Sequence, residues 1–383
     1  MCVRRTFFGD ESTVISFTAF LGKKEVRKLA NRKNKKLRYG FIGAGGIAGT
    51  HLRDLSRRED VELVAMADIS ATSMRGYQDR FDIPHAYSDW KEMLRVEALD
   101  AVSVCTPNRL HERAAIDAMK AGCDVLCEKP LAHSAKAGER MLAASRDLGR
   151  KLVIGFQYRF NPRTQFLRAA ADDGQFGKIL YTRVKALRRR GIPNWGVFGQ
   201  KELQGGGPLI DIGVHVLEMA HYTMGSPEPV SASADMFTYI GNKPSNRVES
   251  AWKGWDYKTY TVEDLAVGRI RFDNGAVVHI EAAFAAHIEK DDWDFQIMGE
   301  KGGATWDPPR IFRDEAGHMV DTSPGWLAEE SFQGMFTRKM NNFVDHCLYQ
   351  TPTLAPAEDG LAVQRMLDAL YRSAERGGKE VNV

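Results

Sequence analysis

Short apolar segments alternate with amphipathic helical stretches between residues 37 and 154. The apolar segments lie at 39–42, 63–67, 101–105, 124–127 and 152–154. Helical spacing of apolar residues occurs between them, at 47–55, 73–81, 88–94, 111–121 and 134–148. Ser88 and Ser134 are expected N-caps, and Gly122 follows the fourth helix where a terminal glycine belongs. This alternation predicts an α/β domain over residues 37–155, built on a doubly wound parallel sheet.

After Gly155 the pattern changes to longer strands separated by turns. A helix is expected at 161–173, followed by strands at 180–188, 229–239, 265–272, 276–284 and 294–298. Asn274-Gly275 predicts a two-residue hairpin turn, because that turn needs positive φ at both centres and this dipeptide tolerates it. Two amphipathic helices, 332–348 and 361–375, complete the pattern. We expect a second, α+β domain over 156–383 with an open, mostly antiparallel sheet, and its last helices are candidates to pack back on the first domain.

Composition and charge narrow the class of protein. The chain has 383 residues, 43% of them apolar, which is enough to bury the cores of two domains. No apolar run approaches the roughly 18 residues that a membrane helix needs, so we expect no membrane association. Residues 1–36 carry ten Lys and Arg against three acidic residues, although the whole chain has a net charge of only +3. The remainder is mildly acidic, so we expect no nucleic-acid partner.

The basic segment 1–36 has little apolar surface to bury, so we expect a disordered extension. Arg4-Arg5 resembles a twin-arginine export signal, but Asp10 and Glu11 interrupt the pattern. The five cysteines are odd in number and lack the paired spacing of a zinc site. We therefore expect free thiols, no metal and a reducing, cytoplasmic location, with export as the alternative.

A glycine-rich turn directly follows the first apolar segment. Residues 43–48, Gly-Ala-Gly-Gly-Ile-Ala, match the G-x-G-x-x-A pattern between a strand and a helix. Such a turn lets main-chain amides approach a pyrophosphate at a helix N-terminus. Asp68, at the end of the second strand, suits the ribose hydroxyls and repels a 2′-phosphate. The pattern predicts a Rossmann dinucleotide-binding domain that prefers NAD to NADP, although Arg75 nearby would suit NADP. The predicted contacts are Gly43, Ala44, Gly45, Gly46, Ile47 and Asp68.

Three further motifs occupy positions where a ligand of this fold binds, at the carboxyl ends of strands or at a glycine-rich entry to a helix. They are Thr106-Pro107-Asn108 with His111, Glu128-Lys129-Pro130, and GGGPLIDIGVH at 205–215. Asp211 and His215 are four residues apart and would share one face of a helix. Spacing alone also fits a structural interpretation, with an aspartate stabilised by the helix dipole and a histidine bonded within the core. The choice between a functional and a structural pair therefore depends on the surrounding motifs.

In order, these motifs resemble the glucose-fructose oxidoreductase, inositol dehydrogenase and rhizopine-catabolism family (Gfo/Idh/MocA) over residues 37–383. The resemblance implies that Lys129, Asp211 and His215 form the active-site set and that Lys129-Pro130 is a cis bond. Residues implied to line the nicotinamide side are Thr106, Pro107, Asn108, His111 and Glu128, and Lys129 and Gln157 are further candidate cofactor contacts. The domain junction GFQYRFNP, at 155–162, implies two substrate contacts, Tyr158 and Arg159.

The implied activity is hydride transfer between NAD(P) and a secondary hydroxyl of a sugar, glycoside or cyclitol. Alcohol oxidation needs a base whose pKa lies near the working pH, so we expect His215 to take the proton, with Lys129 as the alternative. Lys129 would stabilise the reacting oxygen, and Asp211 would orient the substrate or the imidazole. The same motifs also fit a redox-neutral NAD-dependent glycosidase or lyase that oxidises its sugar transiently. A third interpretation is a non-catalytic cofactor-binding regulator.

The second domain offers groups suited to stacking on, or hydrogen bonding to, a polyol substrate. They are Arg188, Trp195, Tyr257, His287 and Trp293, with Arg188 and Trp195 as the preferred contacts. Arg189 and Arg190 extend the positive charge at Arg188, which fits an acidic sugar or a charged edge strand. A broad sheet covered on one face leaves the other to pack, so we expect a homodimer or homotetramer, as the resemblance also implies.

Overall fold

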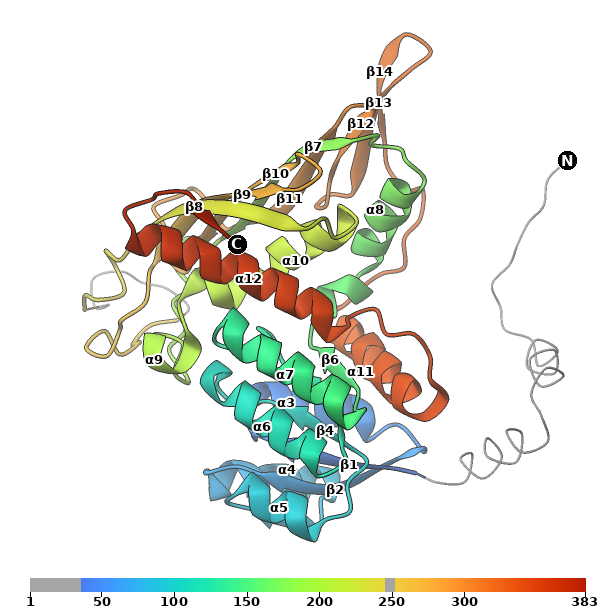
Figure 1. Cartoon of the computed structure of the whole chain (residues 1–383), viewed down its shortest axis with the longest axis vertical. Helices are drawn as coiled ribbons and strands as arrows, with labels where there is room; N and C mark the ends of the chain where they lie inside the picture. The colour runs from blue at the N-terminus through green and yellow to red at the C-terminus, as the bar shows by residue number, and fades with distance from the viewer. Residues whose placement is uncertain (1–35, 245–251) are drawn as a thin grey trace, which may run out of the picture.

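Two sheets organise the part of the chain that the structure describes (Figure 1). The computed structural model describes residues 36–244 and 252–383. The predicted basic extension and its export alternative therefore lie outside the described residues, except for Lys36. In Figure 1 the smaller sheet and its helices form the lower part of the molecule, and the larger sheet forms the upper part.

The first sheet has six parallel strands in the order β3-β2-β1-β4-β5-β6. The strands are β1 (Leu37–Ile42), β2 (Val61–Ala67), β3 (His85–Tyr87), β4 (Ala101–Val104), β5 (Asp124–Cys127) and β6 (Leu152–Ile154). The connecting helices are α3 (Gly46–Leu55), α4 (Ala71–Phe81), α5 (Trp90–Val96), α6 (Asn108–Lys120) and α7 (Ala135–Leu148). The predicted doubly wound sheet is confirmed. Its order places the carboxyl ends of β1, β4 and β5 side by side, where ligands of such sheets bind.

Sequence patterns missed two local features of this domain. Asp89, not Ser88, caps α5, because its carboxylate accepts the main-chain N–H of Lys91 at 2.9 Å. The edge strand β3 was not predicted, because three residues that are exposed or half-buried are too few to show an alternation. Ser134 does cap α7, since its hydroxyl accepts from the main chain of Ala137.

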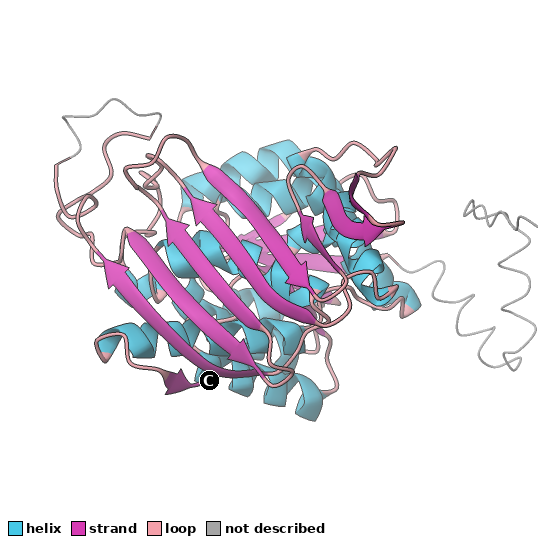
Figure 2. Cartoon of the chain, turned by 90° about the horizontal axis from the view of Figure 1, so that it is seen from above, coloured by secondary structure: helices cyan, strands magenta, loops and turns pink. Residues whose placement is uncertain are grey.

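The second sheet has nine strands in the order β14-β13-β12-β11-β7-β10-β9-β8-β15, and only the β7–β10 pair is parallel within the described residues. The strands are β7 (Ile179–Leu187), β8 (Pro229–Phe237), β9 (Leu265–Phe272), β10 (Val277–Ala283), β11 (Asp292–Gly299), β12 (Gly302–Thr305), β13 (Arg310–Glu315), β14 (His318–Thr322) and β15 (Val381–Asn382). Its shorter helical elements are η1 (Gln157–Phe160), α8 (Pro162–Asp172), α9 (Lys201–Gln204), the π-helical turn η2 (Leu209–Gly213) and α10 (Val214–Thr223). Figure 2 shows helices behind one face of this open sheet, which confirms the predicted, mostly antiparallel architecture.

Strands β9 and β10 form the predicted antiparallel hairpin, but its turn differs from the prediction. The main-chain N–H of Phe272 donates to Ala276 at 3.0 Å across three loop residues. Gly275 has a φ of +85°, whereas Asn274 has no positive φ. A three-residue loop needs a left-handed conformation only at its last position, so the predicted two-residue turn is wrong.

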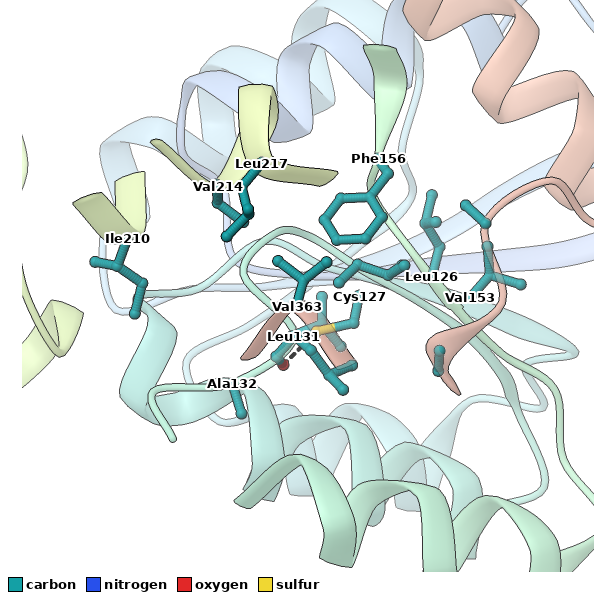
Figure 3. Packing of buried hydrophobic residues seen from close by; sticks show 14 of the residues in the cluster. Leu126, Cys127, Leu131, Ala132, Val153, Phe156, Ile210, Val214, Leu217 and Val363 are labelled. Carbon is teal, nitrogen blue, oxygen red and sulfur yellow. Dashed lines mark hydrogen bonds between the residues drawn. The ribbon is translucent and has the colours of Figure 1, made fainter. Parts of the chain in front are cut away.

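The C-terminal helices α11 (Phe332–Tyr349) and α12 (Ala357–Glu375) lie against the first domain. Helix α11 contacts α3, and α12 contacts α7 as well as strand β8. Asp54 of α3 is buried and accepts hydrogen bonds of 2.8 Å from Thr337 and Gln333 of α11. Figure 3 shows apolar side chains of both domains in one cluster, for example Leu126 and Val363. The two domains therefore share a continuous core.

Four cysteines, Cys105, Cys123, Cys127 and Cys347, are free thiols in the structure, and Cys2 lies outside the described residues. Within 36–244 and 252–383, no helix combines the length and apolar character that crossing a bilayer requires.

Candidate active site

The glycine-rich turn at residues 43–48, the fingerprint turn, lies between β1 and α3 and is open toward the N-terminus of the helix. Gly43 has a φ of +103°, and a Cβ there would lie 2.6 Å from the carbonyl oxygen of Cys105, so this position requires glycine. At Gly45 and Gly46, in contrast, a Cβ would meet no atom of the described part of the chain within 4 Å. Within residues 36–244 and 252–383 no side chain caps α3, so its first amides are left to bind an anion. The turn therefore fits the pyrophosphate of a dinucleotide.

Asp68 is anchored beside this turn at the end of β2. Its carboxylate accepts the main-chain N–H of Ala44 at 2.6 Å and that of Ser70 at 2.7 Å. Each carboxylate oxygen has a second lone pair, so both can still accept a ribose hydroxyl. Ile47, another predicted contact, packs partly buried against the core, and Arg75 is exposed on α4.

The Thr106-Pro107-Asn108 turn joins β4 to α6 and is held by buried polar groups. The ring nitrogens of His111 lie 2.8 Å from the carbonyl of Thr106 and 2.9 Å from that of Pro130. Asn108 donates to the carbonyl of Gln204 at 2.8 Å. Burial lowers the pKa of His111. His111 thus ties this turn to the Glu128-Lys129-Pro130 turn, whose Lys129-Pro130 bond is cis, as the resemblance implied.

Lys129 and Asp211 meet across the two domains. The Lys129 ammonium donates to the carboxylate and to the main-chain carbonyl of Asp211, both at 2.8 Å. Asp211 lies in the π-helical turn η2 rather than in the predicted α-helix, and π-helical turns are frequent at functional sites. The buried carboxylate of Glu263 supports the entry to this turn by accepting from Gly207 at 3.0 Å and from Leu209 at 3.2 Å.

His215 lies in the first turn of α10, the helix that follows, and is buried among aromatic side chains. Its ring centroid lies 5.1 Å from that of Tyr158 and 6.1 Å from that of Trp293. Burial, and after it the positive charge of Lys129, lowers the pKa of His215 well below its ordinary value. The imidazole is therefore neutral over the physiological range. Burial also raises the pKa of Tyr158 to about 12, so its hydroxyl stays protonated.

Several buried polar atoms of this region have no hydrogen-bond partner among the residues that the structure describes. They are Thr106 Oγ1, Gln157 Oε1, His215 Nδ1 and Trp293 Nε1. Unsatisfied buried polar atoms are rare in proteins, and a bound ligand or water is a common explanation. The charge of Lys129 acts on His215, and the Trp293 ring lies 6.1 Å from that of His215, so the unpaired atoms of these two residues support a ligand site here.

Two predicted contacts have other partners. The Arg159 guanidinium is fully buried and donates to Glu218 at 2.8 Å and to the carbonyl of Leu354 at 2.9 Å. It also pairs with Asp359, so it ties η1 to α10 and α12 instead of facing a substrate. The Glu128 carboxylate is likewise engaged inside the core. The inward direction of these side chains could not be read from the sequence, since arginine and glutamate are usually exposed.

The predicted polyol contacts separate into two groups. Arg188 lies over the ring of Trp252, at 4.7 Å, and the Trp195 ring meets Trp252 edge-on at 4.9 Å. His287 instead contacts Arg190 at 3.0 Å. The predictions missed Trp252, which no local motif marks, because only the folding of two loops brings it to Arg188.

Comparison with known proteins identifies the family. Residues 37–156 match the Gfo/Idh/MocA model described as an oxidoreductase family with an NAD-binding Rossmann fold. Residues 168–383 match the model of the C-terminal alpha/beta domain of the same oxidoreductase family. The two matches together cover both domains of the chain.

Individual relatives agree with this match. A D-glucoside 3-dehydrogenase of Escherichia coli is 38% identical over 343 residues, 89% of this chain and 96% of the relative. An inositol 2-dehydrogenase of Rhizobium meliloti is 30% identical over 88% of this chain and 96% of the relative. The structure of a levoglucosan dehydrogenase in complex with NADH has a TM-score of 0.79 and 25% identity, covering 91% of this chain and 99% of the other. With its fingerprint turn and both domains matched, the chain belongs to the Gfo/Idh/MocA family of NAD-binding oxidoreductases.

Proposed function

We propose that the chain is an NAD-dependent dehydrogenase that oxidises a secondary hydroxyl of a sugar, glycoside or cyclitol. One observation carries the proposal: the Lys129 ammonium is held on Asp211 near a buried, neutral His215, at the ligand-binding edge of the parallel sheet. The relatives support it, because their names give a D-glucoside, an inositol and levoglucosan as substrates. All three compounds carry secondary hydroxyls.

Residues of the chain account for the proton and charge movements of such a reaction. NAD, held by the fingerprint turn and Asp68, supplies a hydride acceptor when bound. The Lys129 ammonium donates a hydrogen bond to the reacting oxygen and stabilises negative charge on it. A neutral imidazole can accept a proton, so we assign His215 as the base in oxidation and the acid in reduction. Asp211 orients the Lys129 ammonium.

We assign the substrate side to Tyr158, Arg188 and Trp195. Tyr158 packs on the ring of His215, and the charge of Arg188 acts on both Tyr158 and Asp211. Trp195 remains 50% exposed although it packs against Trp252. An exposed indole beside a guanidinium suits the apolar face and the hydroxyls of a sugar ring.

A panel of glucosides, free sugars and inositols, each with NAD and with NADP, tests the proposal. Glucosides form the first arm, because the relative with 38% identity is named for a D-glucoside. We expect reduced nicotinamide to accumulate in step with oxidised substrate. Release of an aglycone without reduced nicotinamide would instead support the redox-neutral glycosidase or lyase. Cofactor binding without turnover of any polyol would support the third interpretation, a non-catalytic cofactor-binding regulator.

We also propose that the chain forms a homo-oligomer in the cytoplasm. Figure 2 shows one face of the second sheet without helices, and surface ion pairs such as Arg183–Glu281 join its neighbouring strands. A broad sheet face of this kind suits an interface with a second copy. The free thiols fit a reducing compartment. Light scattering should give a multiple of the 42.9 kDa chain mass, and a monomer at micromolar concentration would contradict the proposal.

A further inference from the structure

Three ionisable side chains from distant parts of the chain meet in the core beside the segment that carries Lys129. Oε1 of Glu128 accepts a hydrogen bond from Nζ of Lys339 and lies 3.0 Å from Nε2 of His51. Nζ of Lys339 lies 3.0 Å from the same histidine nitrogen. All three residues are at most 5% exposed. His51 belongs to the fingerprint helix α3, Glu128 directly precedes Lys129, and Lys339 comes from α11 of the C-terminal domain.

The surrounding core is shaped around this cluster. Nδ1 of His51 lies 3.0 Å from the hydroxyl of Ser103, which lies 2.7 Å from the hydroxyl of Tyr39. A Cβ at Gly155 would lie 2.6 Å from Oε1 of Glu128, so glycine leaves the room that the carboxylate occupies. The sequence around Gly155 and Ser103 therefore accommodates a buried charge that the proposed reaction does not itself use.

The charges of the cluster balance at neutral pH. Burial raises the pKa of Glu128, but the Lys339 ammonium and His51 outweigh it and hold this pKa well below its usual range. Burial, and after it the charge of Lys339, lowers the pKa of His51 to about 4. The cluster thus holds one carboxylate, one ammonium and one neutral imidazole. Without Lys339, Glu128 would be an uncompensated buried charge adjacent to Lys129.

We propose that Lys339 is a positioning residue that acts on Lys129 through Glu128. Its buried ammonium neutralises the carboxylate that precedes Lys129, so that Lys129 pairs with Asp211 and not with its own neighbour in the chain. Because Lys339 lies on α11, the C-terminal domain takes part in aligning a catalytic group of the nucleotide-binding domain. The role given to Lys129 rests on the proposed function, whereas the coupling of the buried charges does not.

Removing the Lys339 ammonium leaves His51 as the group able to neutralise Glu128 without displacing Lys129. Among the described residues, the titratable groups that face His51 are Glu128 after β5, Lys339 from α11, Cys105 after β4 and, through Ser103, Tyr39 of β1. Burial raises the pKa of Cys105 and of Tyr39 well above their usual values, so neither ionises near neutral pH. In Lys339→Met, a protonated His51 would therefore replace the lost cation, but only below the pH at which His51 titrates in this variant.

Steady-state kinetics as a function of pH test this coupling. In Lys339→Met, we expect the ratio of wild-type to variant kcat to grow from about threefold near pH 6 to about 10- to 100-fold near pH 9, with a smaller change in substrate KM. Lys339→Arg, which keeps the charge, should recover most of the lost kcat. The double variant Lys339→Met/His51→Gln should lose the recovery in acid. Arg365→Met, on α12, is the matched control, since it removes an exposed cation and its ion pair with Glu139 of α7, and it should follow wild type at every pH.

Histidine NMR on the cofactor-free protein distinguishes failure of this inference from failure of the proposed function. His51 should remain neutral down to about pH 5 in the wild type and should titrate between about pH 6 and 8 in Lys339→Met. Absence of turnover with every polyol would refute the proposed function but leave this measurement intact. A His51 that does not titrate in Lys339→Met, or a kcat ratio independent of pH, would overturn the inference.

A further variant covers the case in which Lys339→Met does not fold. The double variant Glu128→Gln/Lys339→Met removes both charges and leaves no unpaired ion in the core, so it should fold. We expect its kcat not to recover in acid, because no carboxylate remains for His51 to neutralise. Recovery in acid in this double variant would contradict the inference.

Discussion

The ammonium of Lys129 makes two hydrogen bonds to a single residue, reaching both the carboxylate and the main-chain carbonyl of Asp211 at 2.8 Å. The two residues are 82 positions apart and belong to different domains. Their contact ties the turn after β5 to the π-helical turn before α10. A single ion pair thus depends on the relative position of both domains, which makes it a sensitive site for mutation.

Lys129→Met removes the proposed stabiliser of the reacting oxygen while keeping a side chain of similar length. We expect kcat to fall by about 10²- to 10⁴-fold, the range usual for losing a positioned proton donor. Calorimetry should still detect NAD binding, because the fingerprint turn and Asp68 are unchanged. Turnover close to that of the wild type would contradict the assignment of Lys129.

The pH dependence of kcat/KM tests His215. Its pKa is lowered by burial and by Lys129, and a base must be neutral, so activity in oxidation should persist below pH 6.5, the ordinary pKa of histidine. Lys129→Met removes a positive neighbour and should shift the acid limb of its residual activity to higher pH. A wild-type acid limb at or above about pH 6.5 would exclude His215, in this environment, as the base.

Two alanine substitutions in the fingerprint turn should affect different properties, one the stability of the fold and the other the affinity for NAD. Gly43→Ala places a Cβ at positive φ and 2.6 Å from the Cys105 carbonyl, so we expect a loss of about 1–3 kcal/mol in unfolding free energy. Gly45→Ala has open space around it and should leave stability unchanged. Its methyl group would instead obstruct the pyrophosphate and raise the Kd for NAD by about tenfold or more, equivalent to about 1.4 kcal/mol. Urea unfolding and calorimetry of both variants separate the two effects.

Asp68→Asn tests the preference for NAD. The carboxylate accepts from Ala44 and Ser70, and an amide oxygen can keep part of this bonding. We expect kcat/KM with NAD to fall by about 5- to 10-fold, because hydrogen bonds to a charged acceptor are stronger than those to a neutral one. Efficiency with NADP should rise relative to NAD, since the repulsion of a 2′-phosphate is removed. An unchanged ratio between kcat/KM with NAD and kcat/KM with NADP would show that Asp68 does not face the ribose.

Arg159→Met should damage stability and not substrate recognition. The guanidinium is fully buried among Glu218, Asp359 and a main-chain carbonyl, so its loss leaves the buried carboxyl of Glu218 and the half-buried Asp359 without their partner. We expect urea unfolding to show a loss of about 3–5 kcal/mol. Arg365→Met, with an exposed ion pair, should lose at most about 1 kcal/mol. A rise in substrate KM at full stability would restore Arg159 as a substrate contact.

Local patterns determined much of the fold. Strands β5 and β6 were predicted with the bounds the structure shows, because short apolar runs between helices are the mark of a parallel sheet. The hairpin of β9 and β10 followed from a turn dipeptide between alternating segments, although the turn type did not. Strands β12 to β14 were missed, since short strands with exposed faces carry little periodicity.

By itself, the sequence determined that a dinucleotide fingerprint, a Glu-Lys-Pro turn and an aspartate-histidine pair follow one another in a two-domain α/β chain. These are local signals, because each depends on residues within a few positions of one another. Only the tertiary structure decided that Arg159 turns inward and that Lys339 reaches Glu128 across 211 positions. Burial determines such partners, because a charge removed from water is stable only where packing brings a counter-charge next to it. No local sequence pattern encodes that long-range contact.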